Sequence, residues 1–309
     1  MPSTITLTTT NVVTQDGQNS SLIYNFPNSV QFKDHSITVS KISMYYSWTN
    51  INATPLANNT FTYQTRTGAA ANAAVTVPIP DGIYEISDLN NFLQFTFIAA
   101  GFYLINNLGQ NVYYAEFIVN PTKYSVDINC YPVPTALPAG WSLPTNWGLG
   151  YFGAVTYTPI ITTPANFNKI MGQVAGFSTF GGFNLAGTAT ITNSSTTAPQ
   201  VQPNPTIFLS ASGIQNIYSN PSSIIYSVTP TTAVGTQIVE QPPEFSYCKL
   251  LEGTYNELRF RWLGTNLGQL KLLDPTMTIT LLIRDNKAEG FTSGDGKQYT
   301  TVSAGKSMA

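Results

Sequence analysis

The chain has 309 residues, of which only 9% are charged, and its formal net charge is −2. A typical soluble domain has roughly 25% charged residues. A net charge this close to zero also excludes the strongly basic surface that binds nucleic acid or an acidic membrane. We therefore expect no specific nucleic-acid binding. From Ile128 to Val239, Lys169 is the single charged side chain. Because interface centres are depleted in charge, this span predicts packing against neighbouring subunits; a neutral Ser/Thr/Asn surface is the alternative.

Cysteine content and hydropathy exclude further classes. Cys130 and Cys248 are too few for a disulfide framework or a zinc site. No stretch of about 18 apolar residues predicts a transmembrane helix, and no signal peptide is expected at the start. We therefore expect no membrane span.

The N-terminal part alternates in the manner of strands. Residues 1–20, rich in threonine, predict an edge strand or an arm that docks on another subunit. Phe32–Trp48 predicts a long strand whose apolar positions change parity between Val39 and Ile42. A β-bulge near Ser40-Lys41 would keep both halves facing the core.

The hydrophobic period changes from two to 3.6 after Val75, Val77 and Ile79. Ser87 is the predicted N-cap of an amphipathic helix. Its apolar stripe consists of Leu89, Phe92, Leu93 and Phe97. Hairpins are expected to follow, so residues 79–134 are predicted to form a small α+β insertion domain.

The C-terminal half predicts a short helix between Thr163 and Gly172, followed by further short strands. A closing hairpin is expected from 258–263 and 277–285. Its apolar face would carry Trp262, with threonines such as Thr278 on the other face. Residues 286–309 are small and polar and predict a flexible C-terminal tail.

About eight short strands with turn-rich connections predict an all-β fold, a jelly roll or a sandwich, of which we expect a single eight-stranded jelly roll. The expected organisation is an N-terminal arm (1–20), a jelly roll (21–78 and 135–285), the insertion (79–134) and the tail (286–309).

Few residues indicate catalysis. His35 is the single histidine, so a Ser-His-Asp or Cys-His arrangement would depend on it alone. Asp81, Glu85 and Asp88 have the chemistry for acid–base work or Ca²⁺ binding, but turn and cap roles explain them more simply. Segments 294–297 and 305–307 lack the complete phosphate-loop pattern. We expect no enzyme, with no catalytic, cofactor-binding or metal-binding residues and no cofactor.

Basic and aromatic residues suggest binding instead. Four basic residues are expected on the polar face of the closing hairpin: Arg259, Arg261, Lys271 and Arg284. They would bind acidic partners, face solvent, or form ion pairs between the sheets. Trp48, Trp141 and Trp147, with several tyrosines, have ring faces on which sugars stack. The alternative function is therefore a jelly-roll carbohydrate- or receptor-binding module.

Seven segments, in this order, resemble the penton (minor capsid) proteins of virophages and Polinton/Maverick-type elements. They are Ser36–Ile51, Asn58–Tyr63, Ile79–Asn90, Cys130–Thr135, Ile224–Ser227, Leu258–Trp262 and Met277–Asp285. The resemblance runs from about residue 20 to residue 285.

The resemblance implies a jelly-roll subunit that stands upright in the shell, with an insertion projecting outward. Five copies would close each icosahedral vertex of the virion as a homopentamer, beside major capsid proteins. Some of the more distant adenovirus pentons carry an Arg-Gly-Asp motif, which this sequence lacks, so no receptor is implied. A major capsid protein would instead form trimers, usually with two jelly rolls, and an enzyme is the third alternative.

Overall fold

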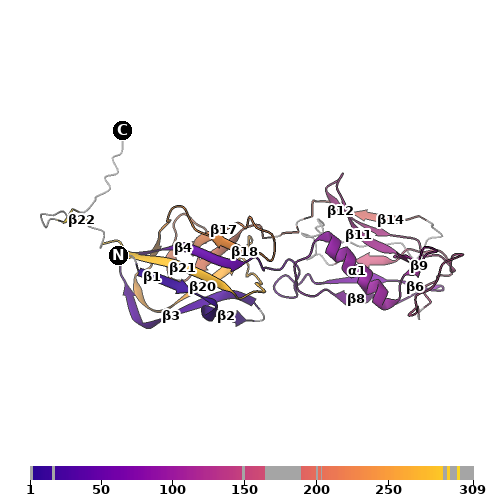
Figure 1. Ribbon diagram of the computed structural model, residues 1–309, viewed down its shortest axis with the longest axis horizontal. Coiled ribbons are helices and arrows are strands. Elements are labelled where there is room, and N and C mark those ends of the chain that lie inside the picture. The colour runs from indigo at the N-terminus through magenta and orange to yellow at the C-terminus, as the bar shows by residue number, and fades with distance from the viewer. Residues whose placement is uncertain are drawn as a thin grey trace. The chain divides into compact units, whose positions relative to one another are not determined.

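The computed structural model describes residues 3–15, 18–147, 150–163, 189–199, 201–202 and 204–287, and the backbone of 291–292 and 298–299. The chain forms two compact units. The first comprises Met1–Ser47 with Asn204–Ala309, and the second is the intervening segment Trp48–Pro203. Figure 1 shows that strands dominate both units. We refer to Trp48–Pro203 as the inserted unit.

The first unit contains two antiparallel sheets. One has the strand order β1-β21-β4-β19-β16, with β18 also paired to β4, and the other has the order β17-β15-β20-β3-β2. The elements are β1 (Ser3–Leu7), the 3-10 helix η1 (Thr9–Asn11), β2 (Val12–Gln15), β3 (Gln18–Phe32), β4 (His35–Tyr45), β15 (Ile207–Ala211), β16 (Ile214–Gln215), β17 (Ile224–Val228), β18 (Gln237–Glu240), β19 (Cys248–Leu250), β20 (Gly253–Leu263) and β21 (Met277–Asp285). Two short strands, β22 (Phe291–Thr292) and β23 (Gln298–Tyr299), pair with each other.

The strand order is that of a jelly roll. The successive long strands are β1, β3, β4, β15, β17, β18 with β19, β20 and β21. The first, eighth, third and sixth of these form one sheet, and the second, seventh, fourth and fifth form the other. Two sheets connected in this way define the eight-stranded jelly roll. The predicted all-β fold is therefore confirmed, and the inserted unit lies between the third and fourth strands.

Strand β4 contains the predicted β-bulge. Lys41 pairs with Thr280 and Val39 with Leu281, so Ser40 is the extra residue between them. The Ser40 hydroxyl donates to the carbonyl of Thr280 over 3.1 Å. The apolar side chains on both sides of the bulge are buried, namely Ile37, Val39, Ile42 and Met44. The bulge thus returns the second half of the strand to the core face.

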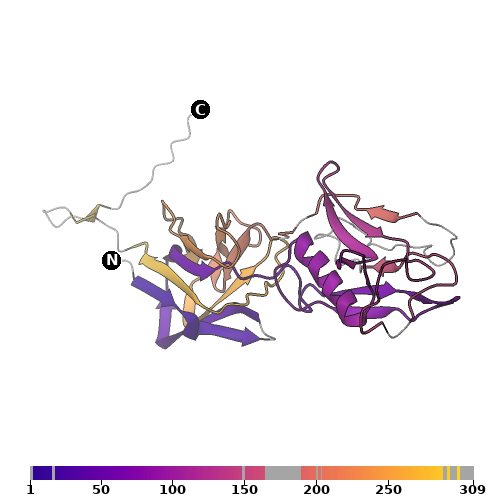
Figure 2. The same ribbon diagram turned by 45° about the vertical axis from the view of Figure 1, so that its right-hand side comes forward.

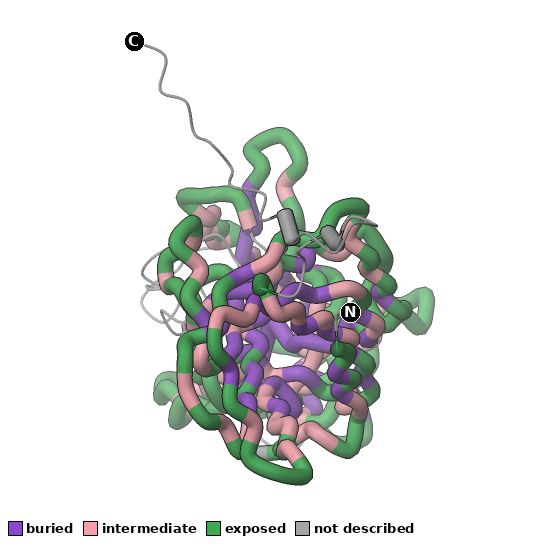
Figure 3. Tube along the Cα trace, turned by 90° about the vertical axis from the view of Figure 1, so that its left-hand side faces the viewer, coloured by how far each residue is buried: buried purple, intermediate pink, exposed green. Residues whose placement is uncertain are grey.

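The prediction that β20 and β21 pair as a closing hairpin is wrong, but the prediction of which side chains on each strand face the core is correct. Strand β20 lies between β15 and β3, whereas β21 lies between β1 and β4 in the opposite sheet. A hairpin needs a short turn, but residues 264–276 cross between the sheets, and the Asn19 amide donates to the Leu272 carbonyl there over 3.0 Å. The predicted inward side chains are all buried: Leu258, Phe260, Trp262, Met277, Ile279, Leu281 and Ile283. Figure 3 shows buried positions inside a rim of exposed loops.

The first 20 residues belong to the sandwich and do not form a separate arm. Strand β1 pairs with β21, from Ser3 opposite Ile283 to Leu7 opposite Ile279. Strand β2 pairs with β3. Ile5 and Leu7 point into the core, at 5% and 0% exposure. The edge-strand interpretation is therefore the correct one, because alternate apolar side chains extend the buried face of the sheet.

The inserted unit is an α+β structure. It has two three-stranded sheets, β13-β5-β8 and β11-β12-β14, and the pairs β9-β10 and β6-β7. Its elements are β5 (Thr60–Gln64), β6 (Arg66–Thr67), β7 (Ala70–Ala71), β8 (Val75–Pro78), α1 (Ile86–Ala100), β9 (Leu104–Ile105), β10 (Asn111–Val112), β11 (Ala115–Asn120), β12 (Ser125–Cys130), β13 (Ile160–Thr162) and β14 (Ile191–Ser194). Figure 2 shows α1 beside the strands of this unit, and α1 contacts β11.

Helix α1 follows the predicted apolar stripe but begins earlier than predicted. Its buried side chains are Ile86, Leu89, Leu93 and Phe97, and Phe92 is half-buried against the same core. The N-cap is Glu85, not Ser87, because the backbone is still extended at Glu85 (φ −87°, ψ 170°) and Ile86 already packs inward. The Asp88 carboxylate accepts the Glu85 N–H over 2.9 Å. Gly101, with φ 70°, ends the helix.

The inserted unit is wider than the predicted insertion of residues 79–134. One buried cluster joins side chains from β5, β8, α1, β11, β12 and β13. Strands β5 and β8 therefore pack here and not in the jelly-roll segment 21–78 where they were expected. Likewise β13 and β14 belong to this unit, although residues 135–285 were assigned to the jelly roll.

One buried amide joins the two ends of the inserted unit. Asn50 is 1% exposed. Its Nδ2 donates to the carbonyls of Val201 and Tyr84, over 2.8 and 2.7 Å, and its Oδ1 accepts the Tyr84 N–H over 2.9 Å. Insertions are tolerated where their ends meet, and Asn50 holds the two chain ends together.

Two sequence predictions lie outside the described residues. They are the helix between Thr163 and Gly172, and the tail beyond Lys287 apart from the β22-β23 pair.

Candidate functional site

His35 contacts the Lys33 backbone and the Phe32 ring. It begins β4 opposite Asp285, and its Nδ1 lies 2.9 Å from the carbonyl of Lys33. Within the described part of the chain, no group of three His, Cys, Asp or Glu side chains is placed to hold a metal ion.

The three acidic residues near the helix start have structural partners. Asp81 accepts the N–H of Ala53 over 2.8 Å, which connects the segment after β8 to the loop before β5. Glu85 and Asp88 cap α1 as described above. These contacts agree with the cap interpretation for Glu85 and Asp88, and they give Asp81 a structural partner 28 residues away.

The four basic residues do not share one face. Arg259 and Arg261 lie on β20, Arg284 lies on β21 in the other sheet, and Lys271 lies in the connection between them. Arg259 Nε is 2.6 Å from Glu257 Oε1. The Arg284 guanidinium lies 3.8 Å from the centroid of the Tyr247 ring.

Of the three tryptophans proposed for sugar stacking, one lines a pocket. Trp48 is buried at 1% exposure and offers no free ring face. The Trp147 ring packs edge-on against Tyr151, with centroids 5.1 Å apart. Trp141 is half-buried and forms part of a pocket wall.

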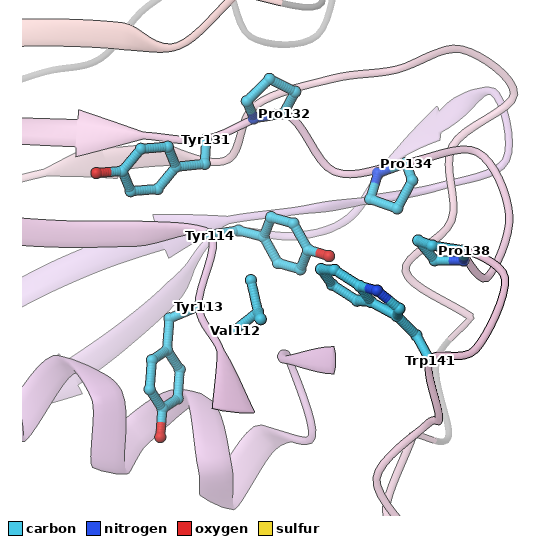
Figure 4. Close-up of a pocket in the computed structure, with 8 residues that line it drawn as sticks. All are labelled: Val112, Tyr113, Tyr114, Tyr131, Pro132, Pro134, Pro138 and Trp141. Atoms are coloured by element: carbon cyan, nitrogen blue, oxygen red, sulfur yellow. The ribbon is translucent and has the colours of Figure 1, made fainter. Parts of the chain in front are cut away.

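This pocket, which we call the aromatic pocket, has a volume of about 450 Å³. Figure 4 shows its lining of aromatic rings, prolines and one valine: Val112, Tyr113, Tyr114, Tyr131, Pro132, Pro134, Pro138 and Trp141. No lining residue carries a charge. Ligand sites are commonly concave and mostly apolar, with a few placed polar groups, and this pocket has that character.

The local sequence explains why the pocket forms here. The β11-β12 ladder continues past the strand ends, because the Tyr131 N–H donates to the Tyr114 carbonyl over 2.8 Å. The following prolines have no N–H and end the ladder. Val133, buried between them, is held by a 2.7 Å bond from its N–H to the Tyr157 carbonyl. The chain thus leaves the sheet while remaining attached to the core.

The far wall is placed by a turn. The Trp141 N–H donates to the Pro138 carbonyl over 3.1 Å, with Gly140 at φ 80° as a type II turn requires. Ser142 and Ile105 then exchange two backbone hydrogen bonds of 2.9 and 3.0 Å. The Trp141 ring is thereby held opposite Tyr114.

Two of the polar groups in the aromatic pocket have no hydrogen-bond partner among the described residues. The Tyr131 hydroxyl donates to Glu116, and the Tyr113 hydroxyl accepts from Asn111 over 3.2 Å. Among the described residues, neither the Tyr114 hydroxyl nor the Trp141 indole N–H has a hydrogen-bond partner. Figure 4 shows the Tyr114 hydroxyl directed toward the Trp141 ring. The sequence predicts Trp141 and several unspecified tyrosines as ring surfaces; the adjacent Tyr113-Tyr114 pair just before β11 was the available signal for which tyrosines these are.

Burial keeps the tyrosines of the inserted unit protonated. Burial and the neighbouring Glu116 raise the pKa of Tyr131 to about 12. Burial, with a smaller effect of Tyr63, raises the pKa of Tyr151 to about 12. Burial also raises the pKa of Tyr114. These hydroxyls therefore stay protonated to higher pH than the hydroxyl of an ordinary tyrosine does.

The inserted unit should lose stability between about pH 10 and about pH 12. An unfolded tyrosine has a pKa near 10, so below that pH both states are protonated and the full stability is present. Above it, the unfolded state releases protons that the folded state retains, which favours unfolding. Tyrosinate absorbance and far-UV circular dichroism, recorded together against pH, measure this. Ionisation of all tyrosines near pH 10 with an unchanged dichroism spectrum would contradict the burial described here.

No helix among the described residues is long and apolar enough to cross a membrane.

Comparison with known proteins gives structural neighbours only. No family model and no curated protein matches the chain. Among solved structures, the crystal structure of the mavirus penton protein is similar with a TM-score of 0.40 and 9% identity, covering 92% of this chain and 98% of that chain. A chain of the Sputnik virophage cryo-EM structure is similar with a TM-score of 0.36 and 10% identity, covering 94% and 100%.

Proposed function

We propose that the chain is a structural capsid protein that forms homopentamers at the vertices of an icosahedral virus shell, beside major capsid proteins. The observation that carries this proposal is an eight-stranded jelly roll whose third and fourth strands are separated by a complete second unit. This architecture agrees with what the sequence resemblance implies, namely one jelly roll in the shell and an insertion that projects from it. A major capsid protein with two jelly rolls agrees less well.

An uncharged surface with two highly exposed large side chains supports self-association of the jelly roll. Ile217 and Tyr218, in the loop between β16 and β17, are 74% and 94% exposed. Beside them is a hollow of about 550 Å³ lined by uncharged residues: Phe208, Asn216, Tyr218, Ser219, Asn220, Ile224, Ile225, Tyr226, Ser227, Thr265 and Leu267. Exposed apolar surface of this kind commonly marks an interface. A closed ring uses two different patches on each subunit, and this surface is one candidate.

Purified protein should form particles of five subunits. Light scattering after size-exclusion chromatography gives the number of subunits, and class averages from electron microscopy give the symmetry. Tyr218→Glu places a charge in the proposed contact and should shift the particles toward monomers, with an unchanged circular dichroism spectrum. Leu108→Glu, at a 76% exposed position of the inserted unit, is the matched control and should leave the rings intact. A strict monomer or a trimer for the unaltered chain would contradict the proposal.

A further inference from the structure

We propose that the aromatic pocket of the inserted unit binds an extended, proline-rich segment of another protein. This inference is independent of the pentamer, because every residue that lines the pocket belongs to one inserted unit. It concerns a ligand class rather than the assembly of the shell.

The first argument is the surface that the pocket offers. Three tyrosines and one tryptophan supply ring faces, and three prolines with Val112 complete the wall. Proline-rich segments dock in aromatic-lined grooves, because their polyproline II conformation is preformed and loses little entropy on binding. Rigid aromatic rings likewise contribute contact area at a small entropic cost. Both partners are thus ordered before they meet.

The second argument is the match of hydrogen-bonding groups. Each Xaa-Pro bond removes an N–H, so a proline-rich backbone presents carbonyl acceptors with few donors. The aromatic pocket offers the complement. The Trp141 indole N–H is a donor only, and it and the Tyr114 hydroxyl are unused within the described residues. A tyrosine hydroxyl is protonated at neutral pH, and burial raises the pKa of Tyr114 further.

The third argument concerns the ligands that the lining disfavours. No charged side chain lines the pocket, so it offers no partner for phosphate, carboxylate or ammonium groups. The nearest carboxylate in this network, Glu116, already accepts hydrogen bonds from Tyr131 and from Asn129, the latter over 2.9 Å. Amide and carboxylate acceptors, which sugar hydroxyls need, are missing from the lining. An uncharged ligand rich in acceptors and apolar rings fits best.

The test is titration of the full-length protein with a blocked deca-proline peptide, followed by calorimetry and tryptophan fluorescence. Trp141→Ala removes the stacking wall and should weaken binding at least tenfold. Tyr114→Phe removes one donor while it keeps the ring, so it should weaken binding about three- to tenfold. Phe95→Ala, at a 64% exposed aromatic position of the same unit, is the control and should bind as the unaltered chain does. Thermal unfolding verifies that each variant folds.

The outcomes separate the alternatives. Saturable peptide binding that follows this order of variants supports the proposal. It is overturned if the unaltered chain does not bind the peptide, or if the Trp141→Ala and Tyr114→Phe variants both bind as tightly as the Phe95→Ala control. A blocked Gly-Ser decapeptide that binds equally well also overturns it, because recognition would then not depend on proline. Binding of a cello- or chito-oligosaccharide in place of the peptide overturns it in favour of a carbohydrate-binding function. Pentamer formation is read separately, by light scattering.

Discussion

Replacing Trp262 with alanine should lower the free energy of unfolding of the jelly roll by about 3–5 kcal/mol. Trp262 is 0% exposed and lies in β20, opposite Leu209 of the neighbouring strand β15. Removal of the indole loses apolar burial and leaves a cavity in a closely packed core. This is a large share of the stability of an ordinary domain. Urea unfolding, followed by circular dichroism, measures the change.

Two control substitutions test the assignment of strand faces. Thr278 is exposed on β21, so Thr278→Ala should change the stability by less than about 0.5 kcal/mol. Trp262→Phe should cost less than Trp262→Ala, since the ring is kept and the indole N–H, buried without a hydrogen-bond partner among the described residues, is removed. Equal losses for Thr278→Ala and Trp262→Ala would show that the two faces are assigned wrongly.

Excising Trp48–Pro203 and joining Ser47 to Asn204 with a short Gly/Ser linker should leave a folded jelly roll. Every strand of its two sheets lies outside the excised segment. The buried cluster around Phe61, Phe97 and Phe117 lies entirely within that segment, so its removal takes a complete core. Circular dichroism should show β structure with cooperative thermal unfolding. Light scattering should give the same number of subunits as for the full chain.

A shorter excision is the matched control. Removal of residues 80–133, the segment that the sequence period marks as the insertion, deletes α1 and β9 to β12 but leaves β5, β8 and β13. These strands would keep half of a core and expose the rest, so we expect aggregation and no cooperative transition. If the shorter excision proved more stable than the longer one, the boundaries at residues 48 and 203 would be contradicted.

The two excisions differ because the period of the apolar residues predicts which side chains of a strand face the core, but not which strands pair or pack together. Alternation gave the inward residues of β20 and β21 correctly, and the change of parity around Ser40 located the bulge in β4. Both depend on the local geometry of one strand. Pairing depends on residues far along the chain, so β20 and β21 were wrongly joined into a hairpin.

The same limit applies to the domain boundaries and to the aromatic pocket. Strands β5 and β8 alternate as jelly-roll strands do, and only their packing against α1 and β11 assigns them to the inserted unit. Trp141 and Tyr114 lie 27 positions apart in the sequence, and a turn at Gly140 and the Ser142–Ile105 bridge bring them together. The secondary-structure propensities of single residues carry no information on contacts between residues so far apart in the sequence.

The hydrogen bond between Asn50 and Val201 also affects the route by which the chain folds. Strands β4 and β15 contribute to opposite sheets of one sandwich, yet a loop on the order of 150 residues separates them, and closing a loop becomes costlier as it lengthens. If the inserted unit folds first, its joined ends act as a short connection. The effective loop is then shorter by about five halvings. Each halving lowers the entropic cost of closing the loop by about 0.6 kcal/mol, which amounts to about 3 kcal/mol in total. The contact at Asn50 therefore makes the order of folding matter, because a folded inserted unit leaves only a short loop to close between β4 and β15.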